Sequence, residues 1–229
     1  REGIFYQNED EIFTAVAEIL TMENIHLYGV GVNLTCYGAI IPKQDNLGGL
    51  AAIAHRIEEQ FDIKLNVISG GNSSSIYLIW KEGLPAGINN LRLGESFLLG
   101  NDTAYGETVP GCVHDTMTLE AQIIELKKKP SLPIGEVGVD AFGEKPYYED
   151  RGIMKRAIIA VGKQDTDLGG MHPTDAQIEI MGGSSDHTIL DVTHADKSYQ
   201  VGDVVSFTLE YGAMLKLATS PYVEKAYIK

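Results

Sequence analysis

Cysteine, basic residues and long apolar runs are scarce in this sequence. Its two cysteines, Cys36 and Cys112, form no CxxC pair, which argues against a disulfide framework and is typical of a reducing cytosol. No apolar run reaches the ~18 residues that a membrane-spanning helix needs, and no signal peptide is recognisable. The sequence therefore predicts a cytoplasmic protein that does not bind a membrane.

Positive charge is scarce as well. The chain has 18 lysines and arginines against 32 acidic residues, and its formal net charge is −14. A nucleic-acid partner would require a basic face. The only basic run, at residues 127–129, precedes Pro130 and is predicted to be a solvated turn. We therefore expect no nucleic-acid partner.

Several common catalytic motifs are absent. The chain has no GxSxG and no HExxH, so a serine hydrolase or a zinc protease has no local support. It has no GxxxxGK[ST], so a P-loop for nucleoside triphosphates is not expected. The six histidines match no standard ligand spacing, and we predict no metal site.

Residues 1–115 alternate predicted strands and helices. Three short apolar, β-branched runs are typical of strands, at residues 25–34, 63–69 and 88–94. The strand–helix–strand order predicts parallel strands with crossover helices. Three strands are too few for a closed barrel of eight, so this half by itself would leave a sheet edge unpaired.

Helical periodicity fills the segments around these strands. Asn8 and Asp45 are expected to cap the first two helices. The second helix is expected to bury its apolar stripe, which consists of Leu47, Leu50, Ala51, Ala54, Ile57 and Phe61. Ser73 or Ser74 is expected to begin a further helix with Ile79 on its apolar side.

Residues 116–229 are predicted to form a β-rich domain. Five segments with alternating or branched apolar residues are separated by turn residues, at 118–126, 151–162, 176–183, 187–192 and 203–211. The longest loop signal lies at residues 162–175. The predicted fold class is thus α/β in residues 1–115 followed by an all-β part in residues 116–229.

The stretch GGNS at residues 70–73 joins a predicted strand to a predicted helix. Unpaired backbone N–H groups at such a turn suit an anion, although a simple capped turn has the same pattern. Gly94 and Glu95 occupy an equivalent turn after the next strand, and ligands bind at the carboxyl ends of parallel strands. Arg92 is expected near the same mouth, or in a surface ion pair. The two turns together predict a cup for a phosphate.

Asp186 and His187 are neighbours in the segment GGSSDH. An aspartate next to a histidine can serve as an acid–base pair, because histidine titrates near neutral pH. A turn histidine capped by the preceding aspartate has the same sequence. Both interpretations stay open at this point.

Seven segments, in this order, resemble the fold-type III, pyridoxal-phosphate-dependent alanine racemase family, and especially its alanine/ornithine racemase branch. They are REG (1–3), LYGVGVNLTCYG (27–38), GGNSSS (70–75), NNLRLGESFLLG (89–100), DAFGEKP (140–146), GGSSDHTILDV (182–192) and EYGAMLKLATSPYV (210–223). The resemblance spans nearly the whole chain. It implies that residues 1–115 are the C-terminal part of a (β/α)8 barrel of the TIM type. It also implies that the β-rich domain reaches into the partner's active site in a homodimer.

The resemblance implies a set of cofactor-binding residues. The phosphate of pyridoxal phosphate would be held by the hydroxyls of Ser73 and Tyr211 and by the backbone N–H groups of Gly94 and Glu95. Arg92 would face the pyridine nitrogen, where a guanidinium keeps that nitrogen unprotonated and tunes the electron sink.

Two further positions follow from the same likeness. Asn33 occupies the position of a family histidine that packs against the cofactor ring. Arg1 falls at the family's arginine near the cofactor hydroxyl and the substrate carboxylate. The substrate implied is a small amino acid.

The sequence departs from the family pattern in three places. No lysine matches the family's Schiff-base lysine, which lies upstream on the first barrel strand, so we predict that the 229-residue chain alone is inactive. The family's catalytic tyrosine aligns with Phe142, which cannot transfer a proton. A partner-loop methionine is replaced by Ser185.

Racemisation requires a second acid–base group on the face opposite the lysine. The sequence offers Asp186, His187 and Asp140 for this role, with Tyr147 and Tyr148 in reserve. If the substrate is ornithine, its second ammonium needs a carboxylate, for which Glu95, Asp140 and Asp186 are candidates.

The expected function is that of an amino-acid racemase of the alanine or ornithine type, which removes and returns the α-proton. One alternative is a protein that binds pyridoxal phosphate without catalysis. Another is a D-amino-acid lyase or a decarboxylase on the same scaffold.

Overall fold

The computed structural model describes residues 9–140, 142–143 and 145–228. The chain forms two compact units, Arg1–His114 and Asp115–Lys229, which we call unit 1 and unit 2. The predictions for Arg1 and Asn8 lie outside the described residues. Within the described part of the chain, no helix is long and apolar enough to cross a membrane.

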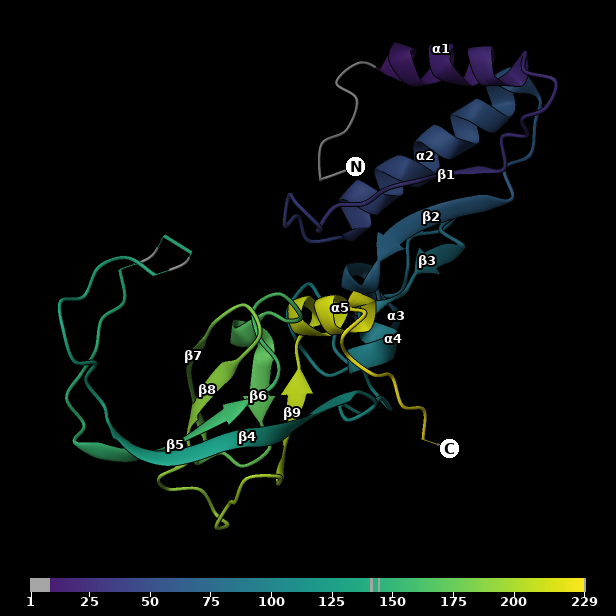
Figure 1. Cartoon of the computed structure of the whole chain (residues 1–229). Helices are drawn as coiled ribbons and strands as arrows, with labels where there is room; N and C mark the ends of the chain where they lie inside the picture. Colours follow the sequence, from purple (N-terminus) through teal and green to yellow (C-terminus); the bar gives the residue numbers. More distant parts are fainter. Residues whose placement is uncertain (1–8, 141, 144, 229) are drawn as a thin grey trace. The chain divides into compact units, whose positions relative to one another are not determined.

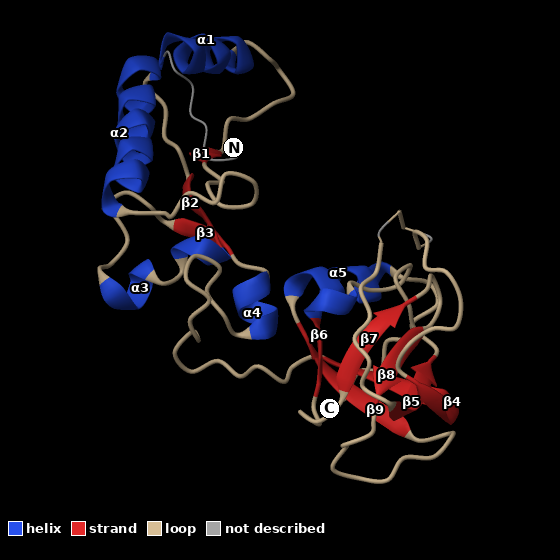
Figure 2. Ribbon diagram, turned by 90° about the vertical axis from the view of Figure 1, so that its left-hand side faces the viewer, coloured by secondary structure: helices blue, strands red, loops and turns tan. Residues whose placement is uncertain are grey.

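Unit 1 is built around a sheet of three parallel strands. In sheet order these strands are β1 (Gly29–Gly31), β2 (Val67–Asn72) and β3 (Asn90–Arg92). The α-helices are α1 (Glu9–Leu20), α2 (Gln44–Phe61), α3 (Leu78–Lys81) and α4 (Glu95–Leu99). Helix α2 connects β1 to β2, and α3 connects β2 to β3, so the predicted parallel order with crossover helices is confirmed (Figures 1 and 2).

Helix α2 supplies much of the core of unit 1. Its buried residues are Leu47, Leu50, Ala54 and Ile57, while Ala51 and Phe61 are half-buried, as the apolar stripe predicted. The predicted cap at Asp45 is wrong by two positions, because Lys43 is the N-cap residue. The side chain of Asn46 accepts the Lys43 N–H at 2.8 Å, and Asp45 lies in the first turn. A carboxylate there complements the partial positive charge of the helix start.

The second strand and the helix after it differ from the prediction. Strand β2 runs on through Gly70 and Gly71, which are buried, and ends at Asn72. Ser73–Ser75 then form one 3-10 turn, and α3 has four residues. Ile79 is 57 % exposed, because Tyr77 and Leu78 face the core in its place. Paired glycines normally indicate a turn, but here they let the side chains of Ile88 and Ser75 approach the strand closely.

Unit 2 is a six-stranded antiparallel sheet with one helix. In sheet order the strands are β6 (Met171–Pro173), β9 (Val204–Leu209), β4 (Thr118–Pro130), β5 (Ile153–Ile159), β8 (Thr188–Asp191) and β7 (Glu179–Gly183). The long strand β4 pairs with β9 through residues 118–122 and with β5 through residues 123–130 (Figure 1). The buried residues of the core include Ile123, Ala157, Ile159, Leu190 and Phe207. The predicted β-rich second half is therefore present.

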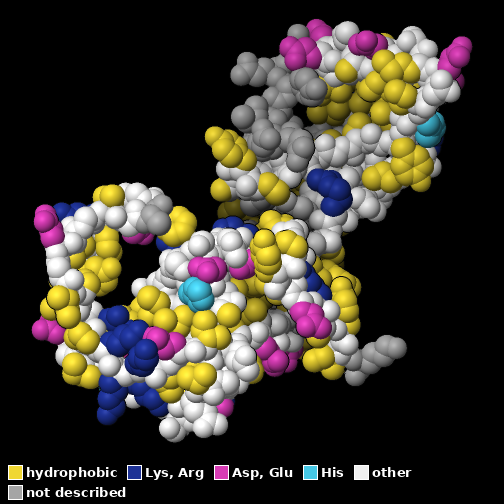
Figure 3. Space-filling view, in the orientation of Figure 1, with side chains coloured by type: hydrophobic (Ala, Val, Ile, Leu, Met, Phe, Trp, Pro, Cys, Tyr) yellow, Lys and Arg dark blue, Asp and Glu magenta, His cyan; other side chains and the backbone are white. Residues whose placement is uncertain are grey.

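Three local predictions for unit 2 are wrong. The segment 162–175 contains a 3-10 turn (Leu168–Gly170) and strand β6. Residues 211–219 form helix α5 (Tyr211–Thr219), which was not predicted. The basic run 127–129 lies in β4 and not in a turn, and Figure 3 shows lysine and arginine side chains gathered in this part of unit 2. Glu125 neutralises part of that charge, because it pairs with Lys127 at 2.9 Å and with Lys129 at 2.5 Å.

Candidate functional site

The two turns that were predicted to form a phosphate cup contact each other after β2 and β3. The oxygen of Ser73 lies 3.3 Å from the N–H nitrogen of Gly94 and 3.1 Å from that of Ser96. The Ser96 hydroxyl lies 3.1 Å from the same oxygen, and both serines are almost fully buried. A hydroxyl oxygen has two lone pairs. Three donors therefore converge on one oxygen that can accept only two hydrogen bonds. An anion oxygen placed there would accept the third.

The turn that carries Ser73 is held from both sides. Asn72 is the N-cap, and its side-chain oxygen accepts the Ser74 N–H at 3.0 Å and the Ser74 hydroxyl at 2.7 Å. The Ser75 hydroxyl donates to the Gly70 carbonyl at 2.6 Å. Gly71 has φ +109°, and a Cβ there would lie 2.8 Å from the Ser75 hydroxyl oxygen. The turn is thus both capped and preorganised, and the capped-turn and anion-site interpretations are compatible.

Arg92 spans all three strands of unit 1. One guanidinium nitrogen donates to the Val32 carbonyl, just after β1, at 2.7 Å. The other donates to the Ser69 hydroxyl of β2 at 2.5 Å, and that hydroxyl donates to the Asn90 side chain of β3 at 2.8 Å. In the described part of the chain the recorded partners of Arg92 are neutral groups, so the alternative of a surface ion pair receives no support. A cation held by neutral partners favours an electronegative ligand beside it.

Asn33 lies next to the same cup. Its side-chain amide donates to the Cys36 sulfur at 3.1 Å, and the Asn72 amide donates to that sulfur at 3.2 Å. Asn33 is thereby joined to the residue that caps the Ser73 turn. Glu95 begins α4 and is half-buried, and a Cβ added at Gly94 would meet nothing within 4 Å. The backbone at Gly94 is therefore open to an approaching ligand.

In unit 2 the predicted acid–base residues lie on two loops. Asp186 accepts the Ser184 hydroxyl at 3.0 Å and lies 3.1 Å from the ring nitrogen Nδ1 of His187. The Ser184 hydroxyl bond, above all, lowers the pKa of the Asp186 carboxyl. Asp140 accepts the Phe142 N–H at 2.8 Å and lies 3.9 Å from the ammonium of Lys163. Lys163 was not among the predicted residues.

Tyr211, another predicted residue, lies on the helix of unit 2. Tyr211 is the first residue of α5 and is 43 % exposed. The preceding residue, Glu210, forms an ion pair with His172 at 2.9 Å. Among the described residues, no group of three or more histidine, cysteine or acidic side chains has the geometry of a metal site.

Sequence reasoning missed three polar residues that hold the cup. Ser69 and Asn90 link β2 to β3 beneath Arg92, and Ser96 donates twice to Ser73. For Ser69 and Asn90 the available signal was a small polar residue inside an otherwise apolar strand. In a buried strand such residues must find partners, and these partners are on the neighbouring strand.

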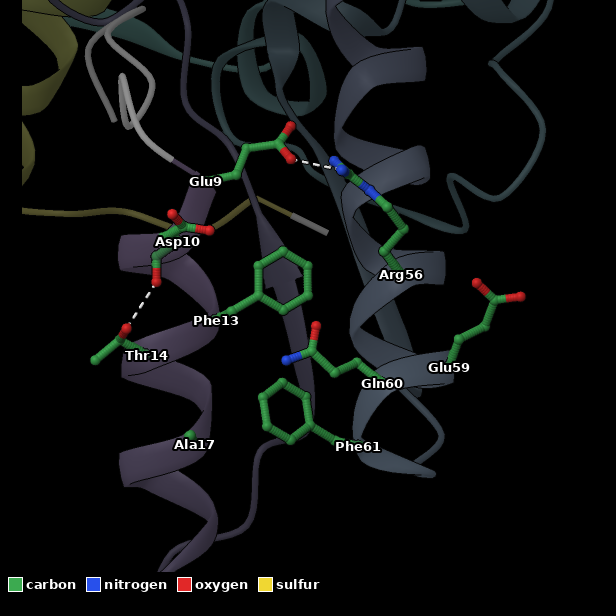
Figure 4. Close-up of a pocket in the computed structure, with 9 residues that line it drawn as sticks. All are labelled: Glu9, Asp10, Phe13, Thr14, Ala17, Arg56, Glu59, Gln60 and Phe61. Carbon is green, nitrogen blue, oxygen red and sulfur yellow. Dashed lines mark hydrogen bonds and ion pairs between the residues drawn. The ribbon is translucent and has the colours of Figure 1, made fainter.

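A groove between α1 and α2 lies in another part of unit 1. Figure 4 shows Phe13 and Phe61 lining it together with Glu9 and Arg56, which form an ion pair at 2.5 Å. The two rings stack with their centroids 6.3 Å apart. Among the described residues, none of those predicted to bind a cofactor lines this groove.

The chain is similar to two curated racemases. It is 57 % identical over 225 residues to an ornithine racemase from Acetoanaerobium sticklandii, covering 98 % of this chain and 63 % of that protein. It is 40 % identical over 227 residues to a lysine racemase from Thermotoga maritima, covering 99 % of this chain and 62 % of that protein. The chain thus spans less than two thirds of the length of either relative. No family model matches it.

Solved structures share the fold. An alanine racemase from Bartonella henselae aligns over 93 % of this chain and 56 % of its own, with a TM-score of 0.58 and 22 % identity. An alanine racemase from E. faecalis aligns over 94 % of this chain and 56 % of its own, with a TM-score of 0.57 and 15 % identity. In sequence the chain is thus similar to an ornithine racemase and a lysine racemase, and in fold to alanine racemases. Of the predicted site residues, unit 1 contains Ser73, Gly94, Arg92 and Asn33, while unit 2 contains Asp140, Asp186, His187 and Tyr211.

Proposed function

We propose that the protein, at the full length of its relatives, is a pyridoxal-phosphate-dependent racemase of ornithine or a related basic amino acid. The observation that carries this proposal is the convergence of two amides and a hydroxyl on Ser73, in a chain 57 % identical to an ornithine racemase. We further propose that unit 1 is part of a TIM-type barrel. In the same proposal the enzyme is a cytoplasmic homodimer.

The residues of the cup suit the phosphate of this cofactor. The N–H groups of Gly94 and Ser96 point at the Ser73 oxygen, and the Ser73 hydroxyl can itself donate its hydrogen, so together they would bind an anion without a compensating basic residue. We assign the same role to the N–H of Glu95 and to the hydroxyl of Tyr211. The net charge of −14 is therefore no obstacle to a phosphate ligand.

Arg92 and Asn33 would lie beside the cofactor ring. The guanidinium of Arg92 is held by Val32 and Ser69, so its position does not depend on the ligand. Because arginine stays protonated, it would donate to the pyridine nitrogen and keep that atom free of its own proton. When bound, pyridoxal phosphate supplies the electron sink that makes the α-proton of an amino acid acidic.

The loops of unit 2 would supply the second acid–base group. Inversion at the α-carbon requires a proton donor on one face and an acceptor on the other. Asp140, Asp186 and His187 are partly exposed and bear groups that can exchange protons. One of the carboxylates would also bind the distal ammonium of ornithine.

The test uses purified full-length protein with pyridoxal phosphate. L-ornithine, D-ornithine, L-lysine and L-alanine are incubated separately, and both enantiomers are followed by chiral chromatography. We expect interconversion, fastest with ornithine or lysine. Cofactor binding without any change of configuration would indicate the non-catalytic alternative, and a smaller product would indicate a lyase or a decarboxylase.

A variant pair tests the cup itself. Ser73→Ala removes the central hydroxyl, and we expect the Kd for pyridoxal phosphate to rise roughly 10–100-fold, the usual effect of a lost hydrogen bond to a charged group. Ser198→Ala changes an exposed serine of unit 2 and should leave the Kd unchanged. If the two variants bound the cofactor with equal affinity, Ser73 would not be part of the phosphate site.

A further inference from the structure

Lys163 is fixed by its backbone to the loop that carries Asp186 and His187. The Lys163 N–H donates to the Ser184 carbonyl at 2.9 Å, and the Gln164 N–H donates to the Ser185 carbonyl at 2.9 Å. A Cβ at the preceding residue, Gly162, would lie 2.5 Å from the Ser185 carbonyl oxygen. The absence of a side chain at residue 162 therefore lets these two segments pair.

The side chain of Lys163 extends to the third segment of this region. Its ammonium lies 3.9 Å from the centroid of the Phe142 ring and 3.9 Å from a carboxylate oxygen of Asp140. The other oxygen of Asp140 accepts the Phe142 N–H, so the carboxylate is held by its own loop. Lys163 thus connects the segments that carry Asp140, Asp186 and His187.

The contacts of Lys163 differ from those of the other paired lysines. Lys64, Lys81, Lys127 and Lys129 approach a carboxylate at 2.5–3.1 Å, with side chains 37–84 % exposed. Lys163 is 30 % exposed, and its distance of 3.9 Å to a carboxylate oxygen is longer than in these four pairs. An aromatic ring takes up one side of its ammonium. This amine is sheltered yet only loosely paired, and a lysine amine is one of the side chains that serve as general acid or base.

The neighbouring candidates are less suited to that task. Phe142 has no exchangeable proton. Asp186 is tied to the Ser184 hydroxyl, which favours its ionised form and makes it a weak proton donor. His187 is engaged with Asp186. We propose that Lys163 is the acid–base residue that unit 2 contributes to racemisation, with Phe142 and Asp140 as its positioning residues.

This inference rests on the proposed racemase function, and its proton balance is simple. In one direction the neutral amine of Lys163 accepts the α-proton of one enantiomer and becomes an ammonium. In the other direction the ammonium returns a proton to the α-carbon on that same face. No electron is gained or lost overall, and no co-reactant is needed.

The test uses the full-length enzyme with its cofactor and two variants. Lys163→Arg keeps the positive charge and the contact with Phe142 but cannot give up a proton at working pH, and Lys163→Met removes both charge and proton. We expect racemisation to fall about 100-fold or more in each. In D2O, one enantiomer should still exchange its α-proton with retention, because the other face is intact. Lys197, whose ammonium lies 4.6 Å from the Tyr199 ring centroid, is the matched control, and Lys197→Arg should keep full activity.

Two further measurements do not depend on turnover. Pyridoxal phosphate should bind the Lys163 variants with a Kd within about threefold of the wild-type value, because the cup lies in unit 1. A substrate amino acid should protect Lys163, but not Lys197, from an amine-selective acetylating reagent, as read by mass spectrometry.

The outcomes separate the two proposals. Failure of the wild-type enzyme to invert any amino acid would overturn the racemase function. Normal wild-type racemisation with an active Lys163→Arg variant would overturn the role of Lys163 alone. The role of Lys163 would also be overturned if His187→Asn, and not Lys163→Arg, exchanged the α-proton in D2O without racemisation.

Discussion

The two units hold their candidate residues in different ways. In unit 1, Ser73 and Ser96 are 4 % and 1 % exposed, and their contacts follow from strands that lie side by side. In unit 2, the side chains of Lys163, His187 and Asp186 are 30 %, 42 % and 57 % exposed, and they stand on loops joined mainly by backbone hydrogen bonds.

This difference matches the chemistry proposed for each unit. An anion is bound well by dry, fixed donors that need no rearrangement. A group that transfers protons must be reached by its substrate and must change charge during each turnover. Unit 1 is thus suited to hold a cofactor, and unit 2 to exchange protons.

The largest effect should come from breaking the sheet of unit 1. In Gly29→Ala the new Cβ would lie 2.0 Å from the Val67 carbonyl oxygen, in the register that pairs β1 with β2. We expect the free energy of unfolding to drop by about 3 kcal/mol or more, measured by chemical denaturation. Gly48→Ala in α2 meets nothing within 4 Å and should raise stability by up to about 1 kcal/mol.

In unit 2, Gly162→Ala should reduce activity more than it reduces stability. Its Cβ would lie 2.6 Å from the backbone nitrogens of Asp186 and His187, so this loop must move. We expect a smaller loss of stability than in Gly29→Ala but a loss of racemase activity of about 100-fold, the usual result of an ångström-scale misplacement. Gly138→Ala, whose Cβ meets nothing, is the control. A folded and fully active Gly162→Ala enzyme would show that the loop does not need this pairing.

Mixing variants tests whether one active site uses both units from different copies. Arg92→Ala should disable the cofactor site of unit 1, and Lys163→Met should remove the acid–base group of unit 2. If unit 2 of one copy completes the cup of its partner, random dimers of the two inactive variants should regain about a quarter of the wild-type activity, since half are hybrids with one intact site. Mixtures that stay inactive after verified subunit exchange would place both units of a site on one copy.

How far the sequence predicts this structure also differs between the units. The apolar stripe of α2 and the parallel order of β1 to β3 follow from periodicity. Strand β2 was placed too early, because Gly70 and Gly71 indicate a turn locally, whereas burial and close packing keep them in the strand. The cup was predicted at Ser73 and Gly94, but its supports Ser69 and Asn90 depend on cross-strand register, which no local pattern gives.

For unit 2 the sequence predicts strands but not the contacts of the loops. Lys163 lies in a short polar segment with no motif of its own. Its contacts appear only in the fold, where Asp140, Phe142 and Ser184 reach it from distant parts of the sequence. Helix α5 was missed although residues 213–218 are good helix formers, because it begins almost directly after strand β9 with Gly212 in its first turn, and Ala213 and Leu217 pack onto the sheet core.

A smaller effect is expected at Tyr77, whose hydroxyl donates to the buried Pro42 carbonyl. Burial raises the pKa of Tyr77 to about 12, with help from its contact with Tyr105. Its neutral form therefore stabilises unit 1 fully below pH ~10, and this contribution is lost as the pH rises from ~10 to ~12. Tyr77→Phe should cost about 1–2 kcal/mol at pH 7 and flatten that alkaline loss, as measured by denaturation at several pH values.

The smallest expected effect concerns the loop of unit 2. The Ser184 hydroxyl lowers the pKa of Asp186, so the ionised carboxylate is favoured in the fold above its ordinary pKa, and this preference is lost as the pH falls through the lowered value. Ser184→Ala should raise the pKa of Asp186 toward its usual range, as read by NMR of labelled aspartate. Ser185→Ala, whose hydroxyl is farther away at 3.4 Å against 3.0 Å, should change it less. Equal shifts would mean that Asp186 exchanges partners within the loop, and unit 2 would then be more adaptable than these contacts indicate.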